Sequence, residues 1–118
     1  MRRLVVKCTW GLERPETLFQ AFTVAATAAA SGAHVSLWLT GDAVWHAVAA
    51  SDDAELPYSP PLSQLRDAVL ATGTLTVCAQ CALRRNISGK DLIEGARIAG
   101  AATFVEETLE PDVTALVY

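Results

Sequence analysis

Short apolar runs alternate along the chain with stretches in which apolar residues recur every three or four positions. The runs are rich in Val and Leu, as expected for strands buried in a sheet. In one stretch Leu18, Phe22, Ala25 and Ala29 share one face, which is typical of a helix. We predict strands at 3–8, 35–39, 75–77, 97–99 and 113–118. We predict helices at 15–30, 43–50, 62–72, 90–95 and 101–110, and a short one directly after Cys78.

Strands that alternate with helices indicate a parallel sheet, because parallel neighbours need long crossover connections. We therefore predict an α/β fold: a three-layer α/β/α domain with a five-stranded, mostly parallel sheet in the order 2-1-3-4-5. A chain of 118 residues is of a size that forms one core, so we expect a single domain over residues 1–118.

The net charge, the length of the apolar stretches and the number of cysteines each exclude or favour a class of function. The chain has 9 Lys and Arg against 13 Asp and Glu, and this net charge of −4 argues against general nucleic-acid binding. The stretch 21–30 is too short to span a membrane, and the apolar run 4–6 is too short for a signal peptide. We therefore expect a cytoplasmic protein without a membrane partner. Three cysteines, two of them spaced C-x-x-C, suit reduced thiol chemistry better than a disulfide framework.

The predicted site lies where the strands end. In open parallel sheets, ligands bind beyond the carboxyl ends of the strands, where the strand order reverses. In the expected order this crevice lies between the first and third strands. The segments 8–11, 40–42 and 78–81 would meet there. The pocket residues that we predict are Thr9, Trp10, Gly41, Asp42 and Arg84.

The thiol of Cys78 is the candidate nucleophile. It follows a strand and precedes a helix, where free backbone N–H groups stabilise a thiolate. Arg84 and Arg85 lie close by in the sequence and would add positive charge. The alternative is that Cys78 and Cys81 are small buried hydrophobic residues that close the junction of strand and helix, as we expect for Cys8.

These motifs resemble the DsrE/DsrF-like family, particularly its small YchN-like members. That family has the pattern C-x-x-C-x-x-x-R-G-I before a short helix, a short strand, a helix and a final strand. The matching positions are Cys78, Cys81, Arg85 and Ile87, with Gly95 and Gly100-Ala101-Ala102 beyond them. Asn86 stands where the family usually has Gly, and Asn also tolerates a left-handed backbone.

The resemblance implies a five-stranded α/β/α sheet and assembly into homo-oligomers, either trimers or hexamers. It also implies a sulfur-relay function in which Cys78 carries a persulfide, with Cys81 as its companion thiol and Arg85 as the motif arginine. The partners would be sulfur donor and acceptor proteins or small thiols. We expect no cofactor and no metal, because two cysteines with only His34 and His46 elsewhere do not match a zinc ligand pattern.

Three other functions remain open. A C-x-x-C thiol–disulfide oxidoreductase fits the helix start but lacks a Gly-Pro between the cysteines. A cysteine phosphatase fits the C-x5-R spacing of Cys78 and Arg84, but the intervening loop has no Gly to cradle a phosphate. A non-catalytic oligomeric scaffold or small-molecule binding subunit would use the cysteines structurally.

Overall fold

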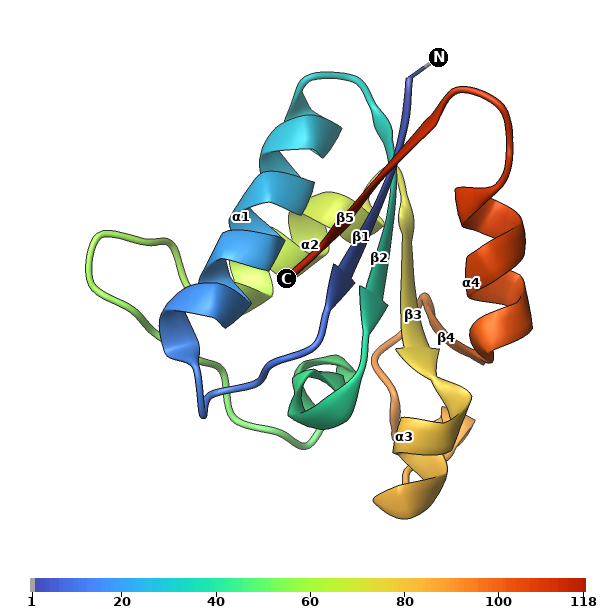
Figure 1. Ribbon diagram of the computed structural model, residues 1–118. Helices are drawn as coiled ribbons and strands as arrows, with labels where there is room; N and C mark the ends of the chain where they lie inside the picture. Colours follow the sequence, from blue (N-terminus) through green and yellow to red (C-terminus); the bar gives the residue numbers. More distant parts are fainter. Residues whose placement is uncertain (1) are drawn as a thin grey trace.

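The computed structural model describes residues 2–118 and contains one sheet flanked by helices (Figure 1). The strands are β1 (Arg3–Cys8), β2 (His34–Leu39), β3 (Thr74–Cys78), β4 (Ala96–Ala99) and β5 (Val113–Val117). The α-helices are α1 (Pro15–Ala30), α2 (Leu62–Leu70), α3 (Ala79–Arg84) and α4 (Ala101–Thr108). Two 3-10 helices, η1 (Gly41–Ala47) and η2 (Gly89–Asp91), complete the described elements.

The five strands are parallel and form one sheet in the order β4-β3-β2-β1-β5. The predicted α/β fold with a five-stranded parallel sheet is confirmed. The order differs from the expected 2-1-3-4-5, because β2 rather than β1 lies beside β3. The chain steps across the sheet in one direction from β1 to β4. It reverses only in the last crossover, through α4, which brings β5 to the free edge of β1.

One face of the sheet carries the main apolar core, beneath α1 and α2. Figure 1 shows both helices on the same side of the sheet, with α4 on the other. The alanine-rich α1 packs closely against β1 and β2 and lies beside α2. The fully buried side chains of this core include Val6, Leu18, Phe22, Leu37, Val69 and Val77. This face therefore supplies most of the hydrophobic stabilisation.

The other face carries a polar network beneath α4. Glu107 accepts hydrogen bonds from the Ser36 hydroxyl and the Trp38 indole N–H. Its second carboxylate oxygen lies 2.6 Å from Arg97, whose Nε donates to Thr76. Buried polar groups must be paired, so these bonds place α4 over the centre of the sheet. The network therefore links α4 to β2, the central strand, through Ser36 and Trp38.

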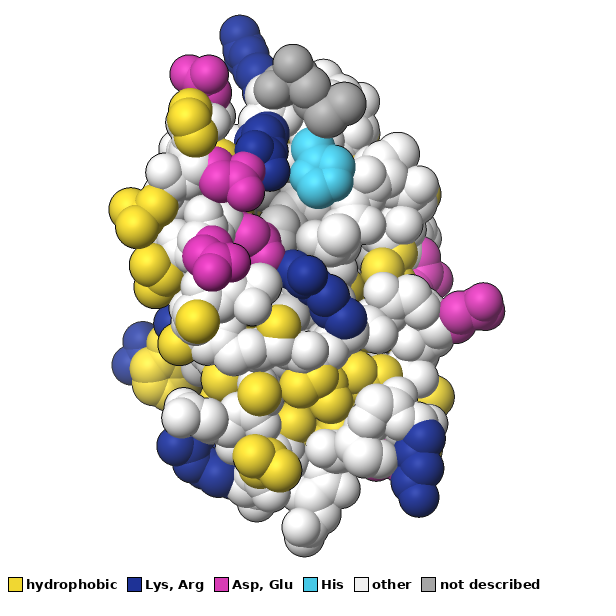
Figure 2. All heavy atoms as spheres, turned by 90° about the vertical axis from the view of Figure 1, so that its right-hand side faces the viewer, with side chains coloured by type: hydrophobic (Ala, Val, Ile, Leu, Met, Phe, Trp, Pro, Cys, Tyr) yellow, Lys and Arg dark blue, Asp and Glu magenta, His cyan; other side chains and the backbone are white. Residues whose placement is uncertain are grey.

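Charged and apolar side chains separate on the face that α4 covers. Figure 2 shows acidic and basic side chains together on its upper half and hydrophobic side chains in a band across its lower half. The strand ends, η1 and α3 lie in the lower part of Figure 1. Within residues 2–118, no helix is long and apolar enough to cross a membrane.

The substitution Glu107→Gln tests the network. Burial raises the pKa of Glu107, but hydrogen bonds from Ser36, Trp38 and Arg97 and the charge of Arg97 lower it by more, to a net value below 4.5. A lowered folded pKa adds stability above the unfolded value, and this stability disappears as the pH falls through the folded pKa. We therefore expect Glu107→Gln to lower the unfolding free energy by about 1–2 kcal/mol at pH 7.

Urea unfolding at several pH values measures this effect. The difference from the unsubstituted protein should shrink as the pH falls below 4.5. The matched control is Glu106→Gln, an exposed neighbour on the same helix, which should change little. A pH-independent difference would contradict the charge-based explanation.

Candidate functional site

Cys78 lies at the junction that the sequence indicated. It is the last residue of β3 and directly precedes the first residue of α3, and its side chain is half-buried. Burial raises the pKa of its thiol, but the backbone N–H groups of Cys81 and Gln80, the Cys81 thiol and the charge of Lys7 lower it by more. The net pKa is below the ordinary value of 9.0. The site therefore favours an anionic sulfur that solvent can reach.

Cys81 is buried and connects α3 to the loop after the neighbouring strand. Its Sγ accepts a hydrogen bond from the Gly41 N–H at 3.2 Å and lies 4.0 Å from Arg84 Nη1. Gly41 has a positive φ of 56°, and a Cβ there would lie 3.1 Å from the carbonyl oxygen of Thr9. A glycine therefore suits this position both for its backbone conformation and for its close contacts.

Arg85 also connects α3 to η1, and its hydrogen bonds go to groups other than the Cys78 sulfur. Its Nε and Nη2 both lie 2.9 Å from Asp42 Oδ1, and its Nη1 donates to the Cys81 carbonyl at 3.1 Å. We had expected Arg85 to stabilise the thiolate directly. It is instead a positioning residue that holds η1 against α3. Asn86, which follows it, has a φ of 56° and so makes the left-handed turn that the sequence led us to expect.

Thr9 and Trp10 lie one strand further from Cys78 than expected, because β2 separates β1 from β3. The Thr9 hydroxyl donates a hydrogen bond to the Tyr118 carbonyl at 2.7 Å. The central carbon of the Arg14 guanidinium lies over the Trp10 ring, 4.4 Å from the ring centroid. A Cβ on the next residue, Gly11, would lie 2.7 Å from the Asp42 carbonyl oxygen. This loop therefore supports η1 from the side opposite α3.

Lys7 is a site residue that the sequence reasoning missed. Its half-buried side chain places Nζ 4.9 Å from the centroid of the Phe104 ring, and its charge lowers the pKa of Cys78. The only signal in the sequence was a lysine that directly follows the apolar run Leu4-Val5-Val6 within the strand. Which residues surround Lys7 depends on the order of the strands in the sheet, and local sequence patterns did not reveal that order.

Cys8 has the structural role that we expected of it. It is fully buried, and its Sγ donates to the Trp10 carbonyl at 3.3 Å. Burial and the charge of Glu13 raise the pKa of its thiol to about 11, while the hydrogen bond to Trp10 offsets part of this rise. Cys8 is therefore protonated at neutral pH.

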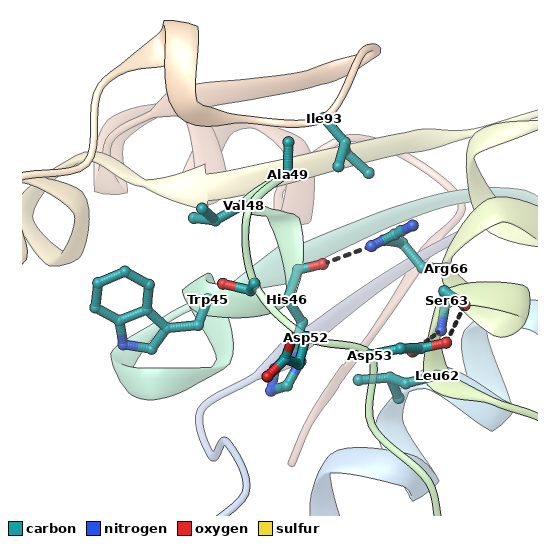
Figure 3. Close-up of a pocket in the computed structure, with 11 residues that line it drawn as sticks. Trp45, His46, Val48, Ala49, Asp52, Asp53, Leu62, Ser63, Arg66 and Ile93 are labelled. Carbon is teal, nitrogen blue, oxygen red and sulfur yellow. Dashed lines mark hydrogen bonds between the residues drawn. The ribbon is translucent and has the colours of Figure 1, made fainter.

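A polar hollow of about 150 Å³ lies beside the C-terminal end of η1 (Figure 3). Arg66 donates to the backbone carbonyl of His46, and Asp53 accepts hydrogen bonds from the hydroxyl and N–H of Ser63. Burial and the nearby Arg66 lower the pKa of His46, while Asp53 and Glu13 offset part of this effect. No residue of the predicted site lines this hollow.

The described part of the chain contains no group of three or more His, Cys, Asp or Glu that could hold a metal ion.

Comparisons with known structures show the same fold. The YchN protein of E. coli matches with a TM-score of 0.84 and 23% identity over the whole of both chains. MTH1491 of Methanobacterium thermoautotrophicum matches with a TM-score of 0.75 and 10% identity, again over both whole chains. These identities show a common fold.

At the level of sequence, the chain is 28% identical to MJ0989 of Methanocaldococcus jannaschii over 109 residues, which are 92% of this chain and 91% of that protein. Residues 8–114 match the model of the DsrE/DsrF-like family. The matched range includes both cysteines of the C-x-x-C motif and extends from the end of β1 into β5. The chain therefore belongs to the DsrE/DsrF-like family.

Proposed function

We propose that the protein is a persulfide carrier that accepts sulfane sulfur on Cys78 and passes it to an acceptor thiol. Its family supports a function of the sulfur-relay type. The observation that carries the proposal is the setting of Cys78, a partly exposed thiol whose pKa is lowered by the surrounding N–H groups, a second thiol and a lysine. Such a thiol is a nucleophile near neutral pH.

The transfer needs only thiol exchange. The Cys78 thiolate attacks the outer sulfur of a donor persulfide, R–S–SH. A bond forms between Sγ and that sulfur while the donor's S–S bond breaks, and its electron pair leaves with the thiolate R–S⁻. An acceptor thiolate then removes the outer sulfur from Cys78 in the same way. The cycle restores the Cys78 thiolate without an added oxidant or reductant.

Donors and acceptors are either proteins or small thiols, and the proposed compartment is the cytoplasm. All three cysteines are free, as expected where thiols remain reduced. Cys81 is buried beside Cys78 and is the proposed resolving thiol. Its thiolate can attack Sγ of the Cys78 persulfide, forming the Cys78–Cys81 disulfide and releasing HS⁻.

Intact mass after incubation of the reduced protein with a polysulfide tests the proposal. We expect the unsubstituted protein to gain the mass of one sulfur atom, and Cys78→Ser to lose at least nine tenths of this uptake, because serine cannot form the persulfide. Cys81→Ser should retain the added sulfur for longer, because the resolving thiol is missing. Cys8→Ser is the matched control and should behave like the unsubstituted protein. Uptake that survives in Cys78→Ser would overturn the site assignment.

The nearness of the two thiols also favours a second function, that of a thiol–disulfide oxidoreductase. The same mass measurement separates the two functions. In Cys81→Ser a carrier still gains sulfur on Cys78, whereas a dithiol oxidant can no longer form the Cys78–Cys81 disulfide and gains no sulfur.

We also propose that the protein forms homo-oligomers. The family resemblance implies assemblies of three or six chains. Val105 on α4 is 48% exposed, Leu109 directly after α4 is 78% exposed, and Val117 on the edge strand β5 is 65% exposed. Exposed apolar side chains beside an open sheet edge favour association, because both lose contact with water when covered.

The substitution Val105→Asp tests this assembly. A carboxylate at the centre of an apolar contact would lose its hydration, so we expect the oligomer to dissociate at micromolar concentration. Size-exclusion chromatography with light scattering measures the mass. Leu12→Asp is the matched control, since Leu12 is 54% exposed but lies in the loop between β1 and α1. A monomeric unsubstituted protein, or an oligomer unaffected by Val105→Asp, would contradict this assignment.

A further inference from the structure

Lys7 occupies an unusual position for a lysine. It lies near the carboxyl end of β1, between the central strand β2 and the edge strand β5, on the face covered by α4, and its side chain is half-buried. Among residues 2–118, the ion pairs involve Arg3, Arg66, Arg85 and Arg97, and Lys7 is in none of them. A partly buried ammonium loses hydration, so it requires compensation from its surroundings.

The strand register places Lys7 and Cys78 on the same face. Lys7 is level with Trp38 on β2, and Trp38 is level with Thr76 on β3. Cys78 lies two residues beyond Thr76, and side chains two residues apart along a strand point to the same face. Lys7 therefore approaches the Cys78 sulfur across β2, from the side of the sheet that α4 covers.

α4 fixes the direction of the lysine side chain. The Lys7 Nζ lies 4.9 Å from the centroid of the Phe104 ring, and this ring packs edge-on against Trp38. α4 begins directly after Gly100, and the preceding Ala99 is the register partner of Cys78. Phe104 thus holds the ammonium near the end of the sheet where the sulfur lies.

The other charged groups around Cys78 are mostly neutralised by their own partners. Arg85 is paired with Asp42, and Arg97 with Glu107. Arg84 lies 4.0 Å from the Cys81 sulfur and is exposed to solvent. Lys7 is therefore the partly buried positive charge that remains for an anionic sulfur.

We propose that Lys7 is the charge partner of Cys78, stabilising the thiolate before sulfur transfer and the persulfide anion after it, and that it selects negatively charged sulfur donors. This inference rests on the proposed carrier function. After transfer, the Cys78 hydropersulfide releases its proton to water, and the outer sulfur carries the negative charge beside Lys7. A donor with negative charge is attracted to the same ammonium, and a donor with positive charge is repelled.

The first test is the pH dependence of Cys78 alkylation by iodoacetamide, which does not require sulfur transfer. We expect Lys7→Met to raise the midpoint of the pH profile of alkylation by roughly half a pH unit to one pH unit. The variant should therefore be alkylated about three- to tenfold more slowly at pH 7. Lys7→Arg should retain most of the effect. Arg2→Met, which removes a charge just before the other end of β1, controls for net charge.

A further variant separates charge from packing. Phe104→Leu removes the aromatic contact but keeps the ammonium. If Lys7 acts only by packing on this ring, Phe104→Leu should shift the alkylation profile as much as Lys7→Met does. That result would overturn the charge-partner role, whereas a clearly smaller shift in Phe104→Leu, in which the ammonium remains but is no longer held by the ring, supports it.

The second test compares two donors of opposite charge, glutathione persulfide and cysteamine persulfide, by the rate of sulfur uptake at low salt. The unsubstituted protein should prefer the anionic donor, and Lys7→Met should reduce that preference several-fold. An unchanged preference and alkylation profile in Lys7→Met would overturn the inference while leaving the carrier function intact. If the unsubstituted protein gains no sulfur but Lys7→Met still shifts alkylation, the carrier function and donor selection fail and only the charge pairing stands.

Discussion

The contact between η1 and α3 is the constraint on which the candidate site depends. These segments follow the neighbouring strands β2 and β3, and three bonds hold them together: the Asp42–Arg85 pair, the hydrogen bond from Arg85 to the Cys81 carbonyl, and the hydrogen bond from the Gly41 N–H to the Cys81 sulfur. Because these bonds fix Cys81, they also fix the N–H group and the thiol that Cys81 presents to Cys78. The motif arginine therefore acts through the position of α3.

The local parts of the site could be predicted from the sequence, because they depend on neighbouring residues. A β-branched run that leads into a C-x-x-C motif indicates a strand followed by a helix, and this alone places Cys78 at the end of β3. The buried position of Cys8 followed in the same way from its place at the end of an apolar strand. The left-handed turn at Asn86 followed from its residue type.

The remaining parts depend on contacts between residues far apart in the chain. The strand order is accompanied by contacts such as those of Glu107 with Ser36 and Trp38, about seventy positions away, and no periodicity reveals such a pairing. With β2 between β1 and β3, Thr9 and Trp10 lie farther from the sulfur than expected, while the charge of Lys7 on the same face of the sheet lowers the pKa of Cys78. The sequence therefore identified the nucleophile, whereas its charged surroundings required the topology.

The contrast between Cys8 and Cys78 shows how this topology determines reactivity. Both cysteines end a parallel strand, yet burial raises the pKa of Cys8 to about 11, whereas the pKa of Cys78 falls below its ordinary value. Burial raises the pKa of both thiols, and it acts more strongly on the fully buried Cys8 than on the half-buried Cys78. At Cys8 the negative charge of Glu13 adds to the effect of burial, and the backbone hydrogen bond with Trp10 offsets only part of the rise. The Cys78 sulfur lies among N–H groups, a thiol and an ammonium, all of which stabilise negative charge. The direction of the surrounding dipoles and charges, and not depth alone, therefore separates a structural cysteine from a nucleophile in this sheet.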